Sequence, residues 1–503
     1  MLVLNKIIKI IANNIKISIF FILSIPFQIL ILNNFGAISY QDILVCLKFL
    51  IFLTILYNLL SIFKMVRKFE FENLINLIII LNILFNFIFF NNGFVKFKIF
   101  IAIQITIIFF YFYYFSQLKL VFNKIYKFVG ITSGLLMPII AFNFFNYDDV
   151  NNKNLFKNDH FSNLKLENKI DTYVIIPDGL MGFDKLKKNK FYNDDNYEQI
   201  LIKNNLIPLK SFANYPTTFA SIPSMLNGSI FEEDTRVEEK KFTKLIHQSS
   251  SIKMFMKNNY EVLWFENSWI GSKCLNSKFT CPQKTRILSF ADNEIVLEYF
   301  KLININMYWS NKILRLFNFK KKYHLDSITE MLKDHEYTKP VFVFAHLLFP
   351  HQPFRVDKNC DPIYLNNTYT AKWHEKKYFI QVECFKKQLI NFNNFIKSKN
   401  RPYLLIIASD TGWTFDDSRH PNHNPKKMWP ESSFQNNIIM SEKYACFNKD
   451  KIVSNAEILL LALHCSENKP FPLIDNDQDQ FDAYYSKTGN VNANKLIKRN
   501  FAR

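Results

Sequence analysis

Long apolar runs fill the first part of the chain, and shorter alternating segments follow them. Five runs contain almost no charged residue: Ile17–Leu32, Ile43–Phe63, Leu74–Phe90, Ile99–Phe115 and Phe128–Phe145. A helix needs about 20 apolar residues to cross the hydrocarbon core of a bilayer, and these runs fall near that length. A helix buried in a soluble protein keeps a polar face, which the runs lack, and a secretory signal peptide is a single run. The pattern predicts an N-terminal bundle of five transmembrane helices over residues 1–148.

Basic residues in the short loops predict the orientation of this bundle. They precede the first run and follow the second and the fourth, at Lys6, Lys9, Lys16, Lys64, Arg67, Lys68, Lys119, Lys124 and Lys127. Lys96 and Lys98, after the third run, oppose the pattern. Because cytoplasmic loops carry the excess of Lys and Arg, we expect the N-terminus in the cytoplasm. Five crossings of a bacterial inner membrane then place everything after Asn146 on the periplasmic side.

Strands alternate with helices in the remainder of the chain. Residues 149–170 are rich in Asn and Lys and predict a linker. The segments that follow predict strands at Thr172–Pro177, Val262–Phe265, Val341–Ala345 and Tyr403–Ala408, and helices at Ser251–Asn258 and Lys376–Lys397. Continuous apolar strands between helices are typical of a mostly parallel sheet that is covered on both faces. Residues 171–470 are therefore predicted to form an α/β domain, and residues 471–503 a C-terminal tail.

Charge is spread along the chain. The net charge of the 503 residues is +19, without strong basic blocks. A nucleic-acid binder gathers basic and aromatic residues into a stripe, which this sequence does not show. We therefore expect no nucleic-acid partner, and we interpret the excess of Lys and Arg as a surface that faces anionic lipid.

Cysteines are placed as in an extracytoplasmic domain. Cys46 lies in the second apolar run, and the other six follow the bundle. An even number of cysteines outside the cytoplasm predicts disulfides, and the lack of a C-x-x-C pair argues against a zinc cluster. Although six cysteines allow other pairings, proximity in the sequence favours Cys274–Cys281, Cys360–Cys384 and Cys446–Cys465.

Two acidic residues and a threonine lie where open α/β sheets place their functional sites. Asp178 and Asp410 each follow a predicted strand, where a carboxylate suits a divalent metal, although Asp178-Gly179 is also an ordinary turn pair. Thr218 opens a predicted short helix, where backbone N–H groups and the helix dipole favour an anion. A metal-bound Thr218 could attack phosphorus there. The alternative is that Thr217 or Thr218 only caps the helix.

Histidines offer nitrogen atoms in the same segments. His346 ends a predicted strand, and His351 follows it in a proline-containing loop. This loop could bind a metal or an anionic ester, although either histidine alone is as readily structural. His420 and His423 follow Asp410 and offer further ligands.

Taken together, the order and spacing of these segments resemble the sulfatase-like branch of the alkaline phosphatase superfamily. The chain looks similar to membrane-bound phosphoethanolamine and phosphoglycerol transferases, including lipoteichoic acid synthase-like enzymes, which also place five helices before an outward-facing domain. The resemblance implies an alkaline phosphatase-like fold with Asp178 and Asp410 as metal ligands, and Thr218 as both ligand and nucleophile. It places His346 and His351 near the substrate. The remaining matches are Ser221, Pro223 and Met225 after the threonine, and Ser409 and Gly412 around the second acid.

The same resemblance implies an activity. A membrane phospholipid would donate a phospho-alcohol group, of the phosphoethanolamine or phosphoglycerol type, and an envelope glycan or lipid would accept it. A phospho-Thr218 intermediate divides such a transfer into two displacements. One divalent ion would assist, with zinc favoured over manganese, calcium or magnesium.

Two positions depart from the family pattern. Thr411 stands where the family has a metal-binding histidine, so either His420 or His423 completes the site, or a harder metal binds, or activity is lost. The segment around Thr218 lacks the C-x-P-x-R pattern from which sulfatases make formylglycine, which favours phosphoryl chemistry. The alternatives are a sulfatase or phosphodiester hydrolase, and a non-catalytic protein that binds envelope lipid or glycan.

Overall fold

The structure is a computed structural model in which the chain divides into two compact units, residues 1–149 with 285–319, and residues 150–284 with 320–503. It describes scattered positions between 24 and 138, and then residues 155–156, 159–189, 192, 196–231, 242–265, 274, 278–281, 325–351, 354, 356–361, 371–413, 437–446, 453–469, 480–486 and 496–502. The five predicted transmembrane runs lie almost entirely outside the described residues. In the part of the chain that is described, no helix has the length and apolar character required to cross a bilayer.

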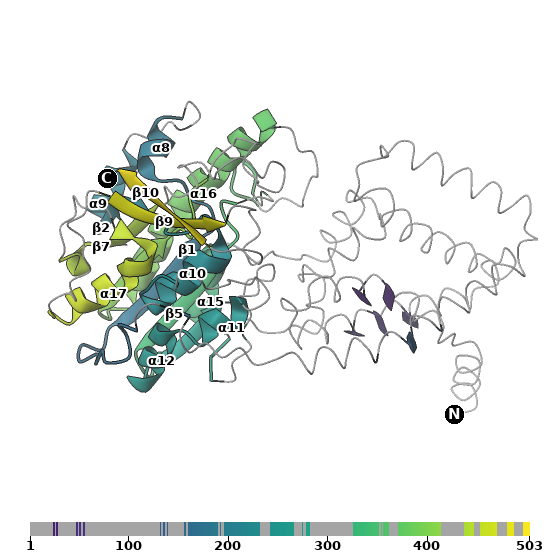
Figure 1. Ribbon diagram of the computed structural model, residues 1–503, viewed down its shortest axis with the longest axis horizontal. Coiled ribbons are helices and arrows are strands. Elements are labelled where there is room, and N and C mark those ends of the chain that lie inside the picture. Colours follow the sequence, from purple (N-terminus) through teal and green to yellow (C-terminus); the bar gives the residue numbers. More distant parts are fainter. Residues whose placement is uncertain are drawn as a thin grey trace, which may run out of the picture. The chain divides into compact units, whose positions relative to one another are not determined.

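The second unit contains the elements of an α/β domain (Figure 1). Its strands are β1 Asp171–Pro177, β2 Leu206–Leu209, β3 Ser211–Phe212, β4 Glu261–Phe265, β5 Val341–Leu347, β6 Tyr403–Ala408, β7 Ile438–Ser441, β8 Val453–Ser454, β9 Gln480–Ser486 and β10 Leu496–Ala502. Its helices are α8 Phe183–Lys187, α9 Tyr197–Lys203, α10 Thr218–Asn227, α11 Phe242–His247, α12 Ser250–Lys257, α15 Leu325–Lys333, α16 Ala371–Ser398 and α17 Asn455–Ser466, with a 3-10 turn, η6, at Glu442–Tyr444.

Six strands form the main sheet, in the order β2-β7-β6-β1-β5-β4. β1 lies between β6 and β5 and is parallel to both, and β4 is parallel to β5. β7 is antiparallel to β6, and β2 is antiparallel to β7. The carboxyl ends of β6, β1 and β5 therefore meet at one edge of the sheet. Two small sheets, β3 with β8 and β9 with β10, complete the described pairings.

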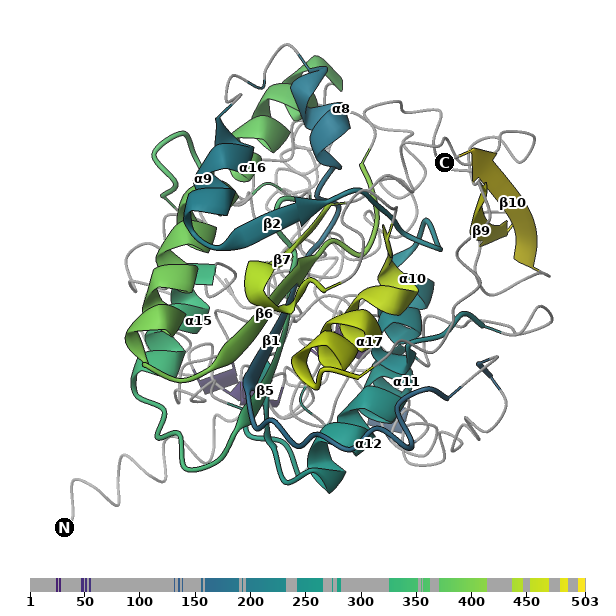
Figure 2. The same ribbon diagram turned by 90° about the vertical axis from the view of Figure 1, so that its left-hand side faces the viewer.

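Alternate residues of the central strands enter two separate cores. In β1, Val174 and Ile176 belong to one core, whereas Tyr173 and Ile175 belong to the other. The first core is shared with α10, α11, α12 and α17, and the second with α8, α9, α15 and α16. Figure 2 shows the two helix groups on opposite sides of the sheet. Since both faces of the strands are buried, the strands appear in the sequence as continuous apolar runs.

The predicted sheet is largely confirmed. All four predicted strands exist and pair in parallel, and both predicted helices exist, with ends that differ from the prediction by at most five residues. The sequence analysis missed the antiparallel edge formed by β7 and β2. β2 has only four residues and contains Pro208, which suits an edge strand and weakens the strand pattern.

Three disulfides join the cysteine pairs that proximity in the sequence predicted: Cys274–Cys281, Cys360–Cys384 and Cys446–Cys465. They close short loops, with sequence separations of 7, 24 and 19 residues. The pair Cys446–Cys465 joins the last turn of α17 to the segment after η6, so this helix is tied at its carboxyl end.

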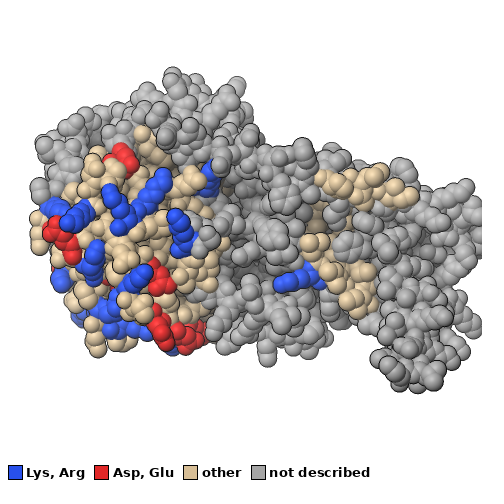
Figure 3. All heavy atoms as spheres, turned by 90° about the horizontal axis from the view of Figure 1, so that it is seen from below, with Lys and Arg blue, Asp and Glu red and all other residues tan. Residues whose placement is uncertain are grey.

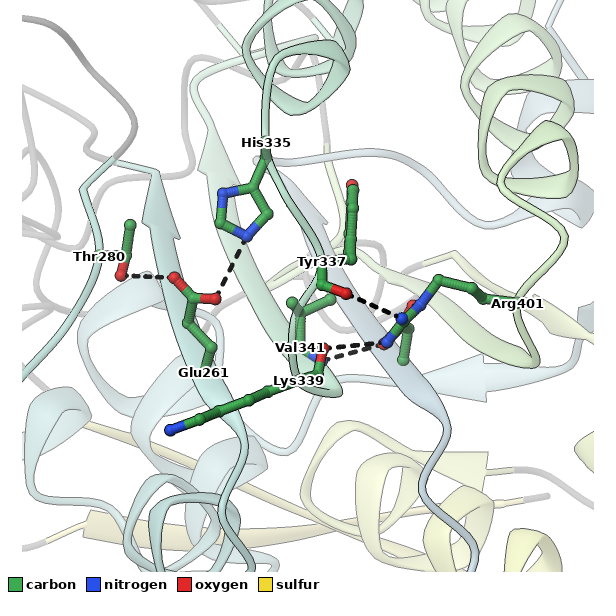
Figure 4. A network of polar contacts seen from close by, with 8 residues as sticks. Glu261, Thr280, His335, Tyr337, Lys339, Val341 and Arg401 are labelled. Atoms are coloured by element: carbon green, nitrogen blue, oxygen red, sulfur yellow. Dashed lines mark hydrogen bonds and ion pairs between the residues drawn. The ribbon is translucent and has the colours of Figure 1, made fainter.

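An ion pair holds the amino end of the sheet together. Arg401, just before β6, donates two hydrogen bonds to the carboxylate of Asp171, at 2.6 and 2.9 Å. The guanidinium also donates to the carbonyl oxygens of Tyr337 and Lys339 (Figure 4). Asp171, which is 2% exposed, in turn accepts a hydrogen bond from the backbone N–H of Val341 at 3.0 Å. One buried carboxylate thus connects the first residues of β1 and β5 to the start of β6.

A second polar cluster lies on β4 at the same end of the sheet. Glu261 accepts a hydrogen bond from the Thr280 hydroxyl at 2.7 Å and lies 3.3 Å from Nε2 of His335 (Figure 4). These contacts join the start of β4 to the segment that precedes β5. The amino end of the sheet is therefore occupied by structural contacts among described residues.

Charged side chains are distributed over the surface of the α/β unit. On the face shown in Figure 3, Lys and Arg side chains of the described residues are dispersed, with Asp and Glu side chains between them. This distribution agrees with the spread of charge along the sequence.

Replacing Arg401 with Met is expected to lower the free energy of unfolding by about 3 kcal/mol, because Asp171 would remain buried without its counter-charge. Chemical denaturation of the full chain measures this difference. Lys187→Met is the matched control, since Lys187 pairs with Glu198 at 2.9 Å with 39% and 32% of the side chains exposed. An exposed pair contributes about 0.5 kcal/mol. Equal losses in the two variants would contradict the role given to Asp171.

Thiol labelling of the denatured, unreduced protein should modify at most Cys46, because the other six cysteines are paired. After reduction, all seven cysteines should react. Labelling of several cysteines without reductant would show that the pairs do not form.

Candidate active site

Asp178 lies one residue beyond β1, at the carboxyl edge of the sheet. Its backbone N–H donates to the carbonyl of Leu347 at 2.9 Å, which continues the pairing of β1 with β5. Gly179 then turns the chain with a φ of +67°, a conformation that costs glycine little. A side chain there would also approach the Trp413 ring to 3.0 Å. The turn therefore requires glycine, and it holds Asp178, which is 3% exposed, facing the neighbouring strands.

Asp410 lies two residues beyond β6 and is fully buried. Its Oδ1 accepts the N–H of Gly179 at 2.9 Å, and its Oδ2 accepts the hydroxyl of Thr218 at 2.5 Å. The preceding Ser409 accepts the N–H of Leu180 at 2.7 Å and donates to the carbonyl of Thr411 at 2.7 Å. The loop after β6 is thus fastened to the loop after β1 by side-chain bonds on consecutive residues.

Thr218 is the first residue of α10. The preceding Thr217 has extended backbone angles, as a residue before a helix does, and its side chain makes no capping hydrogen bond. Thr218 is half-buried, and the eight residues from Ala220 to Asn227 are all buried, which fixes α10 against the first core. The Thr218 hydroxyl therefore lies in the first turn of the helix, where the helix dipole favours an anion.

His346 brings a nitrogen donor to the two carboxylates. It is the residue of β5 that pairs with Ile176 of β1, and it is 3% exposed. Its Nε2 lies 3.9 Å from Oδ2 of Asp178. One donor atom from each of Asp178, His346 and Asp410 lies within 4.8 Å of the others. An ion about 2 Å from each ligand atom holds its ligands roughly 3–4 Å apart, so small side-chain shifts would let one ion contact all three.

Burial alters the titration of this group. Burial, together with the nearby Asp178 carboxylate, raises the pKa of Asp410 to about 7. Burial, with a smaller contribution from His351, lowers the pKa of His346 to about 3. At neutral pH His346 is therefore an uncharged imidazole, the form that binds a metal. A divalent cation would offset the repulsion between the two buried carboxylates.

His351 lies beside the cluster and is half-buried. Its backbone N–H donates to the carbonyl of Asp178 at 3.1 Å, and its ring packs edge-on against Trp413 with 4.6 Å between ring centroids. Trp413 stacks on Tyr378, whose hydroxyl donates to the carbonyl of Gly179 and accepts the N–H of Met181, both at 2.9 Å. An aromatic wall thus supports the turn that carries Asp178 and limits the positions open to His351.

The structure brings together five of the six residues that the sequence analysis singled out as site residues: Asp178, Thr218, His346, His351 and Asp410. The sixth, His420, and the alternative His423 lie outside the described residues. Thr411 is 8% exposed and lies next to the cluster, at the position where the resemblance leads one to expect a histidine.

The sequence analysis placed His346 near the substrate and left open whether its loop binds a metal, and the structure places it beside the two carboxylates. This position follows from the pairing of β5 with β1, which cannot be read from the sequence of one strand alone. The sequence analysis missed Tyr378 and Asn455, which contact the site from distant helices. No local pattern at these two positions marks such a contact.

Solved structures that are similar to this chain include bacterial transferases and a hydrolase. The C-terminal periplasmic domain of phosphoethanolamine transferase EptC from Campylobacter jejuni is 14% identical, and the match covers 59% of this chain and 89% of that one, with a TM-score of 0.35. The integral membrane protein lipooligosaccharide phosphoethanolamine transferase A from Neisseria meningitidis is 12% identical over 72% of this chain and 67% of that one, with a TM-score of 0.38. Phosphonate monoester hydrolase from Agrobacterium radiobacter is 10% identical over 63% and 80%, with a TM-score of 0.37. No protein-family model and no curated protein sequence matches the chain.

Zinc affinity of the metal-stripped protein should rise about tenfold per pH unit below pH 7 and level off above it. The reason is that Asp410, whose pKa is raised to about 7, must lose its proton to bind the ion. His346, whose pKa is lowered to about 3, is already neutral throughout this range and adds no slope. Calorimetric titration with zinc chloride at several pH values measures the profile. Asp410→Asn should abolish most of the affinity, and a profile without slope between pH 5 and 7 would contradict the assignment.

Proposed function

We propose that this protein is a membrane-anchored, metal-dependent phosphotransferase. It moves a phospho-alcohol group from a phospholipid to a glycan or lipid of the bacterial envelope through a phospho-Thr218 intermediate. One observation carries the proposal: the Thr218 hydroxyl opens α10 and donates to Asp410, within the group formed by Asp178, His346 and Asp410. A nucleophile, a set of metal ligands and an anion-binding helix start therefore lie at one point.

The donor atoms support a metal with mixed oxygen and nitrogen preference. Asp178 and Asp410 would supply carboxylate oxygens, and His346 an imidazole nitrogen. The Thr218 hydroxyl lies close enough to Asp410 to be a fourth ligand. Zinc accepts this combination, whereas calcium and magnesium prefer oxygen atoms only. His346 therefore provides a nitrogen ligand although Thr411 replaces the expected histidine, and His420 stays a proposed ligand.

The side chains divide the reaction into two displacements. In the first, Oγ1 of Thr218 attacks phosphorus and its proton leaves along the hydrogen bond to Asp410; the bond from phosphorus to the diacylglycerol oxygen breaks, and this oxygen takes up the proton. In the second, the acceptor hydroxyl attacks phospho-Thr218 and loses its proton, the bond from phosphorus to Oγ1 breaks, and Oγ1 takes up that proton. The N–H groups at the start of α10 bind the phosphoryl oxygens in both displacements. When bound, a divalent ion supplies further positive charge against these oxygens.

His351 is proposed to contact the substrate. It lies next to Asp178 and is only half-buried, so its ring is accessible from outside the group of metal ligands. Its edge-on contact with Trp413 restricts the ring to few orientations. A positioned imidazole there can donate a hydrogen bond to the phosphodiester.

The location of the reaction follows from the apolar runs and the disulfides. The Lys/Arg bias of the loops favours an α/β domain on the periplasmic side of the inner membrane. Three disulfides suit an oxidising compartment of this kind. A membrane anchor keeps the site near the surface where a phospholipid donor is found.

A hydrolase is the second candidate, because the same site would serve it. Water would then replace the acceptor hydroxyl in the second displacement, and Thr218 would keep its role. The two activities differ in whether free phospho-alcohol accumulates when no acceptor is present.

Replacing Thr218 with Ala should reduce diacylglycerol release from phosphatidylethanolamine or phosphatidylglycerol vesicles by at least about a thousandfold. The matched control is Thr217→Ala, since this neighbouring hydroxyl makes no capping bond. The control should stay within about threefold of the native rate. Full activity of Thr218→Ala would exclude Thr218 as the nucleophile, and no activity of the native protein toward either lipid would favour the non-catalytic alternative.

A further inference from the structure

The start of α17 contacts both halves of the candidate site. Asn455, the first residue of this helix, is 1% exposed and lies beside the loop after β6 and beside α10. Its Nδ2 lies 2.7 Å from the carbonyl oxygen of Ser409 and 3.0 Å from that of Asp410. The same Nδ2 lies 3.0 Å from the hydroxyl oxygen of Ser221 on α10.

These neighbours determine which way the amide of Asn455 points. Carbonyl oxygens accept hydrogen bonds and cannot donate them, so the NH₂ group must face Ser409 and Asp410. Two N–H bonds serve three acceptors, and therefore one of the N–H groups is shared. Ser221 lies one helical turn after Thr218, so its bond to Asn455 holds the first turn of α10.

The start of α17 is itself firmly placed. Ser454 and Glu457 form a capping box at this helix start. The N–H of Ala456 donates to Oδ1 of Asn214, four residues before Thr218, at 3.2 Å. β8, which ends at Ser454, pairs with β3, which precedes the same segment. The carboxyl end of the helix is tied by the disulfide of Cys465, so α17 is held at both ends.

From these contacts we infer that Asn455 is a positioning residue, which holds the first turn of α10 against the loop after β6 and so sets the separation of Thr218 Oγ1 from Asp410 Oδ2. The expected effect on kcat rests on the proposed function, whereas the expected effect on the distance from Thr218 to Asp410 rests on geometry alone. Asn455 bonds to the backbone carbonyl of Asp410, and its bond to Ser221 connects it to the helix that carries the nucleophile.

Asn455→Ala should lower kcat for diacylglycerol release by on the order of a hundredfold, because a nucleophile displaced by about 1 Å reacts that much more slowly. KM for the lipid should stay within about threefold, since no substrate contact is removed. Asn455→Asp keeps the volume but turns a carboxylate oxygen toward two carbonyls, so it should be at least as damaging. Zinc affinity of Asn455→Ala should fall by about tenfold, as when the support of a metal ligand is removed.

Ser221→Ala tests the connection to α10 alone. It should lower kcat by about tenfold, and the double variant should be no worse than Asn455→Ala, because both changes break one chain of contacts. Asn393 offers the matched control: it is fully buried, donates to the carbonyl of Asn204 at 3.1 Å and accepts the Tyr403 hydroxyl at 3.0 Å, at the opposite end of β6. Asn393→Ala should lower stability by a similar amount and leave kcat within about twofold.

The inference would be overturned by a kcat of Asn455→Ala within threefold of native, or by an equal loss of kcat in Asn393→Ala. If Asn455→Ala does not fold, Ser221→Ala decides alone, and an unchanged kcat in that variant overturns the inference. A crystal structure of the folded variant separates this question from the activity. The distance from Thr218 Oγ1 to Asp410 Oδ2 should then exceed about 3.5 Å, beyond hydrogen-bond reach, even if the native protein transfers no lipid group. An unchanged distance would refute positioning by Asn455.

Discussion

Both oxygens of the buried Asp410 carboxylate are committed to distant parts of the chain. One accepts the N–H of Gly179 after β1, and the other accepts the hydroxyl of Thr218 at the start of α10. The two bonds can form together only if the Asp410 carboxylate stays within about 3 Å of both the Gly179 nitrogen and the Thr218 hydroxyl, which requires the ends of β6 and β1 and the start of α10 to meet. Everything else in the site depends on this constraint: the glycine turn, the aromatic wall and the neighbouring carboxylate of Asp178 are arranged around a single buried acid.

Burying Asp178 and Asp410 side by side is unfavourable without positive charge, and the raised pKa of Asp410 reflects that cost. At the amino end of the sheet, the charge of a buried acid is neutralised by a side chain of the protein itself. There, Asp171 has Arg401 as a permanent partner and serves only to hold strands. At its amino end the sheet thus has a buried carboxylate whose charge is paired, and this carboxylate serves stability. At its carboxyl end it has two neighbouring carboxylates that would be stabilised by a cation, and these belong to the candidate site.

The parallel strands could be predicted because burial on both faces leaves an uninterrupted apolar signal. The acids at their ends could be predicted for the same reason, since a polar residue after such a run stands out. Edge strands such as β2, with Pro208, carry a weaker signal. The placement of His346 and Asn455 depends on strand order and on helix packing, which link residues far apart in the sequence. The disulfides could be predicted because each joins cysteines that are near in sequence. His420 lies outside the described residues, so its role as a ligand stays a prediction.

The donors of the site come from the ends of three adjacent strands, and the interval between Asp178 and His346 holds most of the connecting chain. β4 and β5 pair in register, from Glu261 with Val341 to Phe265 with Ala345, although a long stretch of sequence lies between them. Strand pairing, and not the length of the connecting chain, therefore sets the spacing of the donors. For protein engineering, this means that the connecting chain can be altered separately from the strand ends that carry the donor atoms.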